Sequence, residues 1–249
     1  MLILGIETSA KACSAALCRD GELLAQSYER TGLTHSRTLL PMIENMLSNT
    51  ETPKDAIDMV AVAQGPGSFT GIRIGISTAK GLCWGLDIPA VGVSTLEAMA
   101  QSARFVPEGT IVCPAMDARR SQLYNALFTV QNGALVRLTE DRAIAADALA
   151  EELSGSGKSV WVLGDGWAIC EKALPSTANA ILKYLSARSI KGIGPVIAAL
   201  SAPWPPRSFA GRRRSACVSR RRAKPRPERK TCCRFIFVFP RQNASGRAA

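Results

Sequence analysis

Histidine is almost absent from this sequence, and its scarcity excludes several kinds of enzyme. The only histidine among 249 residues is His35. A single histidine cannot form a His-Glu-x-x-His motif or the first shell of a histidine-rich metal site. No second histidine is available for a hydrolytic triad, and no cysteine has a histidine nearby in the sequence. We therefore expect neither protease activity nor a bound metal, and we expect His35 to have a structural role at the start of a helix.

Paired cysteines and long hydrophobic runs are also missing. The cysteines of the first 190 residues form no Cys-x-x-Cys pair, so we expect buried, reduced thiols at positions 13, 18, 83, 113 and 170. No stretch approaches the roughly 18 consecutive apolar residues that span a membrane. The first seven residues lack the basic segment of a signal peptide. We expect a soluble, cytoplasmic protein that makes no contact with a membrane.

Acidic residues are nearly absent from the last part of the chain. Residues 207–249 contain 14 lysines and arginines but a single acid, Glu228. The remaining residues contain 17 basic and 19 acidic side chains, so they carry a net charge of −2. The net charge of +11 therefore comes from one segment, and it does not indicate a uniformly basic nucleic-acid binder.

The order of the predicted elements favours an α/β fold. Three strands joined by a turn at Asp20-Gly21 come first, and strands and helices then alternate, which is typical of a ribonuclease H-like half-domain. A dinucleotide-binding fold would instead begin with a strand, a G-x-G-x-x-G turn and a helix. The pattern predicts strands at 2–7, 12–19, 22–29, 58–63, 88–93, 110–116, 122–130, 134–138 and 159–163, and helices at 39–47, 71–86, 95–102 and 146–153.

This order predicts two α/β subdomains and a tail. The first subdomain should span residues 1–105 and the second residues 106–189. Residues 190–249 should form an irregular basic tail, because their prolines and arginine runs follow neither helical nor strand periodicity.

A glycine-rich segment links the strand at 58–63 to the helix at 71–86. Backbone N–H groups of such a turn, together with the helix N-terminus, can hold an anion. The same glycines can instead form a tight structural turn that lets the helix pack on the sheet, and the residue types alone do not decide between these interpretations. No Gly-Lys-Ser/Thr ends the segment, so it is not a Walker A loop. Its key residues are Gly65, Gly67, Ser68, Thr70, Gly71 and Arg73.

Five groups of residues, in order along the chain, resemble the TsaB (YeaZ) family. They are IETS at 6–9 with SAAL at 14–17, HSRTLLPMI at 35–43, GPGSFTGIRIG at 65–75 with AKGL at 79–82, VSTLEA at 93–98, and MDARR at 116–120. The resemblance covers residues 1–189, about three quarters of the chain.

The resemblance implies an actin-like ATPase fold and a non-catalytic role. Members of this family pair with the catalytic subunit TsaD, which transfers a threonylcarbamoyl group to a tRNA adenosine beside the anticodon. The resemblance also implies a TsaE-type ATPase in the complex, indirect contact with tRNA, no cofactor and no catalytic residue. Glu7 stands where the family usually has an aspartate, which argues against a metal role. Two alternatives remain: a stand-alone actin-like ATPase or phosphotransferase that uses Glu7 and loop 65–71, and a basic-tailed RNA-binding protein.

Two helical segments, 34–47 and 71–86, match those through which the family binds TsaD. The apolar residues of each helix cover more of its surface than one narrow stripe, so one side of the helix can pack on the sheet while another contacts a partner. In the alternative interpretation, both are ordinary core helices. Without TsaD the same helices can pair two copies of this chain. The predicted interface residues are Leu39, Leu40, Ile43, Met46, Leu47, Ile72, Ile76 and Cys83.

The family pattern stops near residue 190, and the genetic code offers an explanation. Codons chosen for residues 230–247, when read from one base earlier, translate to N-L-L-P-V-Y-L-R-L-P-Q-A-E-R-E-R-E. This string resembles the usual C-terminal ending of the family. We therefore interpret the tail as the product of a single-base frameshift between residues 190 and 229, with a genuine RNA-binding arm as the alternative.

Overall fold

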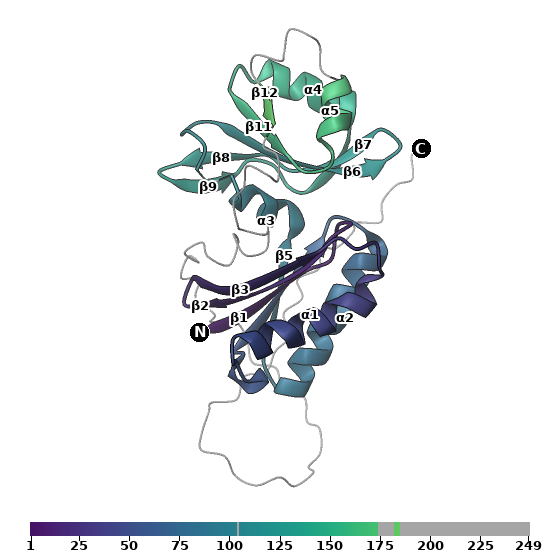
Figure 1. The fold of residues 1–249 in the computed structure, drawn as a ribbon. Helices are drawn as coiled ribbons and strands as arrows, with labels where there is room; N and C mark the ends of the chain where they lie inside the picture. Colours follow the sequence, from purple (N-terminus) through teal and green to yellow (C-terminus); the bar gives the residue numbers. More distant parts are fainter. Residues whose placement is uncertain (104, 174–181, 185–249) are drawn as a thin grey trace, which may run out of the picture.

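The computed structural model describes residues 1–103, 105–173 and 182–184, which form two α/β subdomains (Figure 1). The predicted tail, 190–249, lies outside the described residues. The end of the second subdomain, 185–189, lies outside them as well. None of the helices in the described part of the chain combines the length and hydrophobicity needed to cross a bilayer.

The first subdomain is built on a five-stranded sheet with the order β3-β2-β1-β4-β5. β1 (Leu2–Glu7) pairs antiparallel with β2 (Cys13–Arg19) and parallel with β4 (Met59–Gly65). β3 (Glu22–Glu29) is one edge and β5 (Ala90–Ser94) is the other. The antiparallel hairpins followed by parallel crossovers confirm the predicted ribonuclease H-like topology.

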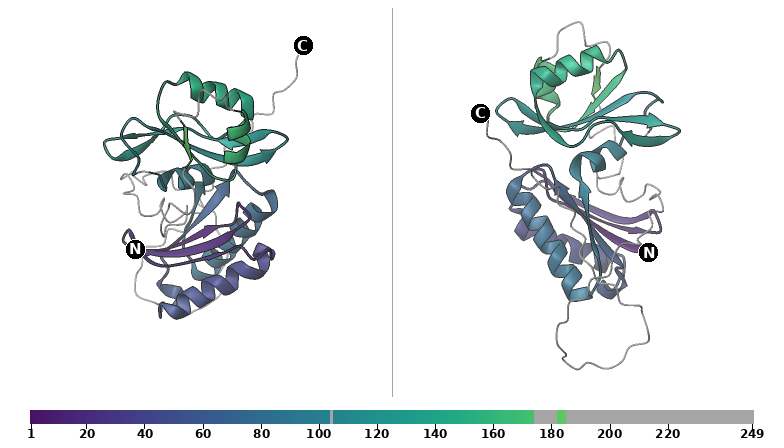
Figure 2. Two further views of the ribbon diagram at one scale, coloured as in Figure 1. Left: turned by 45° about the horizontal axis from the view of Figure 1, so that its top comes forward. Right: turned by 180° about the vertical axis from the view of Figure 1, so that it is seen from behind.

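Two long helices cover the same face of this sheet (Figures 1 and 2). They are α1 (His35–Asn49) and α2 (Phe69–Leu86), which lie side by side. A short 3₁₀ turn, η1 (Lys54–Ala56), follows α1. Aliphatic side chains of β1, β2 and β4 form one core with the inner sides of both helices. α1 runs through Pro41 without ending there, although proline has no N–H to donate to the preceding turn.

The second subdomain contains a seven-stranded sheet. Its central strand β6 (Ile111–Arg119) pairs parallel with β11 (Val160–Leu163) and antiparallel with β7 (Gln122–Asn125) and β8 (Phe128–Gln131). The remaining elements are β9 (Ala134–Arg137), β10 (Arg142–Ala145) and β12 (Leu182–Tyr184), with helices α4 (Ala146–Gly155) and α5 (Trp167–Ala173). The side chains of α4 and α5 pack on β6 and β11 to form a separate core.

A short helix, α3 (Thr95–Gln101), joins the two sheets. The Ser94 hydroxyl accepts a hydrogen bond from the Glu97 N–H at 3.1 Å, so Ser94 caps this helix as its sequence suggests. Leu96 and Ala100 of α3 pack with Val112 of the second sheet. The predicted division at residues 105 and 106 stays a prediction.

Most predicted elements are confirmed, but one strand is wrong. Residues 122–130 form two strands, β7 and β8, rather than one. The break lies at Leu127, whose N–H donates to the Thr139 hydroxyl at 2.8 Å, while the Leu138 N–H donates to the Leu127 carbonyl. β10 and α5 were not predicted, because neither has a clear apolar period in the sequence.

Candidate functional site: the glycine-rich loop and the outer face of the first two helices

The glycine-rich loop connects β4 to α2 and turns through left-handed backbone angles. Gly65 and Gly67 have φ values of +116° and +152°, which residues with a Cβ rarely adopt. The hydroxyl of Ser68 accepts a hydrogen bond from the Gly71 N–H at 3.3 Å and so caps α2. These local requirements account for the Gly-Pro-Gly-Ser sequence at the start of the helix.

The turn between β1 and β2 lies directly against this loop. The Ser68 N–H donates to the Ser9 carbonyl at 2.7 Å, and the Thr8 hydroxyl donates to the Gly71 carbonyl at 2.8 Å. A Cβ on Gly71 would clash with the Thr8 carbonyl, and a Cβ on Gly67 would lie 2.5 Å from the Ser9 carbonyl. The glycines therefore permit the close approach of the chain's own backbone, which favours the structural-turn interpretation over a phosphate site.

Glu7, the residue considered for a metal role, is enclosed by this packing. Its Oε1 accepts the Ser9 N–H at 2.5 Å. Its Oε2 and the Ser9 hydroxyl have no hydrogen-bond partner within the described structure. Burial raises the pKa of Glu7, although the hydrogen bond from the Ser9 N–H and the electrostatic interaction with the nearby His35 act in the opposite direction. A carboxyl group that is desolvated in this way favours its neutral form and is a poor cation ligand.

His35 joins the same turn to α1. Its Nε2 lies 2.9 Å from the Ala10 carbonyl, which can only accept, so this nitrogen carries the proton. The contact agrees with the structural role expected for His35 at the helix start. Across the described ranges, no three His, Cys, Asp or Glu side chains gather closely enough to hold a metal ion.

The residues predicted for a partner interface divide into two groups. Most of them are buried in the core of the first subdomain: Leu39, Ile43, Met46, Leu47 and Cys83. Ile72 and Ile76 are half-buried, and Ile76 packs against the same core. Leu40 alone is exposed, at 45%. In this conformation, therefore, the buried side chains contact the chain's own sheet and cannot also contact a partner.

The sequence analysis did not single out the aromatic residues that α2 exposes. Phe69 is 67% exposed and Trp84 is 85% exposed. Single exposed apolar side chains are ordinary, but several of them on one face can mark an interaction site. With Leu40 of α1, Phe69 and Trp84 define an outer α1–α2 face.

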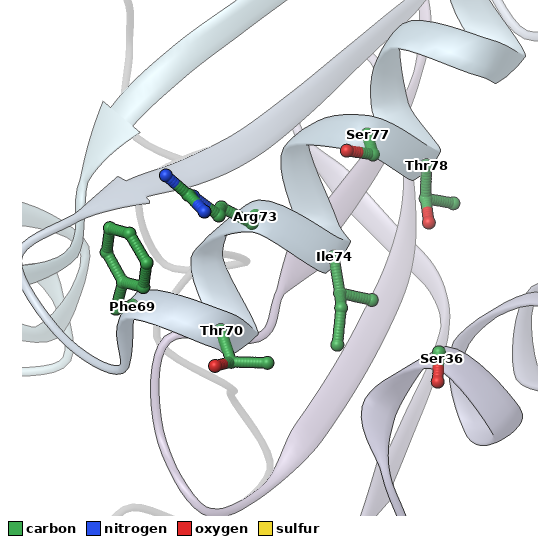
Figure 3. A pocket seen from close by; sticks show the side chains of 7 residues that line it. All are labelled: Ser36, Phe69, Thr70, Arg73, Ile74, Ser77 and Thr78. Atoms are coloured by element: carbon green, nitrogen blue, oxygen red, sulfur yellow. The ribbon is translucent and has the colours of Figure 1, made fainter.

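A groove of about 420 Å³ lies on this face, between the first turn of α1 and the first three turns of α2 (Figure 3). The Arg73 guanidinium carbon lies 3.8 Å from the centre of the Phe69 ring, an interaction that orients both side chains. Arg73 thus belongs to the outer face rather than to the structural loop. The groove is lined by Ser36 of α1 and by Phe69, Thr70, Arg73, Ile74, Ser77 and Thr78 of α2.

The sheet topology and the packed glycine loop together define a protein with the actin-like ATPase fold, as predicted. Comparison with known proteins identifies the family within this fold. Residues 29–195 match the family model described as "TsaD: tRNA N6-adenosine threonylcarbamoyltransferase". The "tRNA threonylcarbamoyladenosine biosynthesis protein TsaB" of Escherichia coli K12 is 38% identical over 168 residues, 67% of this chain and 72% of that relative. The chain belongs to the TsaB family.

Further comparisons agree with this assignment. The TsaB protein of Bacillus subtilis is 35% identical over 164 residues, which cover 66% of this chain and 71% of the relative. The solved structure of YeaZ from Pseudomonas aeruginosa superposes with a TM-score of 0.64 at 28% identity, covering 80% of this chain and 90% of that one. The predicted family resemblance is therefore confirmed.

Proposed function

We propose that this chain is a non-catalytic subunit of a tRNA-modifying complex, and that its outer α1–α2 face binds a TsaD-type threonylcarbamoyltransferase. The observation that carries the proposal is the exposure of Phe69, Trp84 and Leu40 on two adjacent helices. The names of the curated TsaB relatives supply the pathway, threonylcarbamoyladenosine biosynthesis. The transferase acts on tRNA, and this chain supports it without performing the chemistry.

The loop geometry supports the non-catalytic assignment. In the alternative, a stand-alone ATPase, the phosphates would approach the N-terminus of α2 and Glu7 would face a cation. Instead, backbone atoms of Thr8 and Ser9 occupy the space beside the loop glycines, and the Glu7 carboxyl group is buried. We therefore propose that the loop fixes α1 and α2 relative to the sheet, so that the partner meets a rigid surface.

The complex has further proposed members. We place the chain in the cytoplasm, with a TsaE-type ATPase as a third component and with tRNA contacted mainly through the transferase. When the transferase is absent, two copies of this chain can pair through the same exposed helices, since an uncovered apolar face favours association.

Co-purification with the matching transferase tests the proposal. Phe69→Asp and Trp84→Asp should leave the melting temperature nearly unchanged, because both side chains are exposed, and should abolish the complex. Tyr28→Asp is the matched control, because Tyr28 is an equally accessible aromatic, 64% exposed, on the edge strand β3. Binding that survives both α2 substitutions, or that is lost equally in the control, would contradict the assignment of this face.

A further inference from the structure

The outer α1–α2 face carries an excess of positive charge. The two helices contain three lysines or arginines, namely Arg37, Arg73 and Lys80, and a single acid, Glu44. Glu44 is already paired with Lys54 at 3.0 Å. The chain up to residue 206 has a net charge of −2, so this cationic face is a local feature and not a property of the whole body.

Arg73 is the cation best placed to contact a partner. It lies on the exposed side of the second turn of α2, and it forms no ion pair with any residue of the described structure. Figure 3 shows its guanidinium beside the Phe69 ring, and this stacking restricts the rotamers of the long side chain. The guanidinium is therefore already oriented before a partner binds, which lowers the entropic cost of an ion pair.

The surroundings of Arg73 suit a carboxylate on a helix. Hydroxyl groups of Thr70, Ser77 and Thr78 line the groove and can donate further hydrogen bonds. Farther along α2, the Cβ positions of Gly81 and Gly85 would meet no atom within 4 Å. The small residues leave room for a partner helix to lie close, because interaxial distance depends on the side chains at the contact.

We propose that Arg73 binds an aspartate or glutamate on a helix of the catalytic subunit, and that the cationic α1–α2 face thereby favours this partner over a second copy of the chain. The inference rests on the proposed function and deepens it. It makes Arg73 a specificity residue, while Phe69, Trp84 and Leu40 supply most of the apolar contact area.

The symmetry of a pair of identical chains explains why the charged face favours the transferase over a second copy. A two-fold symmetric pair of this chain brings each face against an identical face, so cations meet cations. Like charges across an interface oppose association, whereas a partner with acidic residues at the same place gains attraction. The apolar contacts act in both complexes, and therefore the charge decides which one predominates.

The salt dependence of the two associations tests this idea in the full chain. Higher ionic strength screens exposed charges, with a Debye length of about 10 Å at 0.1 M and about 3 Å at 1 M. Between these concentrations the affinity for the transferase should fall, and self-association, measured by sedimentation, should rise. The same direction of change for both associations would overturn the proposal.

Substitutions of Arg73 give a second, independent test. Arg73→Glu should weaken transferase binding by about tenfold or more and reverse its salt dependence, while Arg73→Lys should retain part of the affinity. Lys158→Gln changes the net charge away from the face and should have no effect. Exchange of one interface acid of the transferase for lysine should restore binding to the Arg73→Glu variant.

The outcomes separate this inference from the proposed function. If the unaltered chain does not bind the transferase, the proposed function fails and the inference fails with it. If the unaltered chain binds, but Arg73→Glu binds equally well and no acid-to-lysine exchange in the transferase affects the variant, only the role of Arg73 is refuted.

Discussion

Ile43 and Leu40 lie one turn apart on α1, and together they test the core and the proposed partner face separately. Ile43 is 2% exposed and belongs to the core of the first subdomain, whereas Leu40 is 45% exposed on the outer face. Both appear among the interface residues predicted from the sequence. Their replacement by alanine should therefore have different consequences: Ile43→Ala should destabilise the fold, and Leu40→Ala should weaken the complex.

The burial of each side chain sets the expected magnitudes. Removal of a buried isoleucine side chain costs about 2–5 kcal/mol, the sum of the lost transfer free energy and the cavity term. For a domain of this size, each 1 kcal/mol lowers the melting temperature by about 2–4 °C, so Ile43→Ala should lower it by at least about 4 °C. Leu40→Ala should change the free energy of unfolding by no more than about 0.5 kcal/mol.

Thermal unfolding of the two variants and calorimetric titration with the transferase measure both effects. Leu40→Ala should reduce the affinity by up to several-fold at an almost unchanged melting temperature, since truncation of most interface residues costs no more than about 1 kcal/mol. The reasoning is refuted if Ile43→Ala abolishes binding without any loss of stability while Leu40→Ala binds normally. In that case α1 would present the opposite side to its partner.

Three more changes test the loop, the buried acid and the tail. Gly71→Ala should destabilise the chain by about 1 kcal/mol or more, because the new Cβ would clash with Thr8. Gly81→Ala, whose Cβ would lie in open space on the same helix, should stabilise the chain by about 0.5–1 kcal/mol. Chemical denaturation measures both free energies of unfolding. The pKa of Glu7 is raised above 4.5 in the folded state, so the protonated carboxyl group favours folding at acidic pH and this contribution is lost as pH rises. Glu7→Gln should therefore have a higher melting temperature than the parent chain at neutral pH, but not below pH 4.5. A difference in melting temperature that stays constant across this pH range would contradict the burial of an ionisable Glu7. Deletion of 207–249 should leave the melting temperature unchanged and improve solubility, and restoration of the shifted frame should raise stability and transferase affinity. If the deletion instead prevents complementation of a strain lacking its own TsaB while the restored frame adds nothing, the basic arm is genuine.

The sequence predicted the first sheet well because its signals are local. Short apolar runs ended by turn residues give β1, β2 and β4, and the turn at Asp20-Gly21 adopts the positive φ angles that such a hairpin requires. The second sheet was less predictable because long-range contacts shape it. Pairing with β7 holds β10 in place, and Arg142 of β10 forms an ion pair with Glu152 of α4 at 2.6 Å. A four-residue strand of this kind has no signature of its own.

Helical periodicity could identify an apolar side but not what covers it. Leu39, Ile43 and Met46 recur at the spacing of one helix side, and this spacing is the same whether the side meets a sheet or another protein. The residues that the structure leaves exposed, Phe69 and Trp84, lie outside that pattern. The useful signal was an aromatic residue on the side of the helix that faces away from the sheet, and this side can be recognised only when the inner side has been assigned.

The glycine-rich loop shows why a motif needs its neighbours before it can be given a chemistry. In isolation, Gly65–Gly71 is equally suited to an anion and to a tight turn. The turn between β1 and β2 makes the difference, since Thr8 and Ser9 contact the same glycines that a phosphate would need. His35 links this turn to α1, so one junction fixes the N-termini of both outer helices. The loop therefore fixes the two helices whose outer face we propose as the transferase-binding surface, and loss of its close packing should disturb partner binding through the helices.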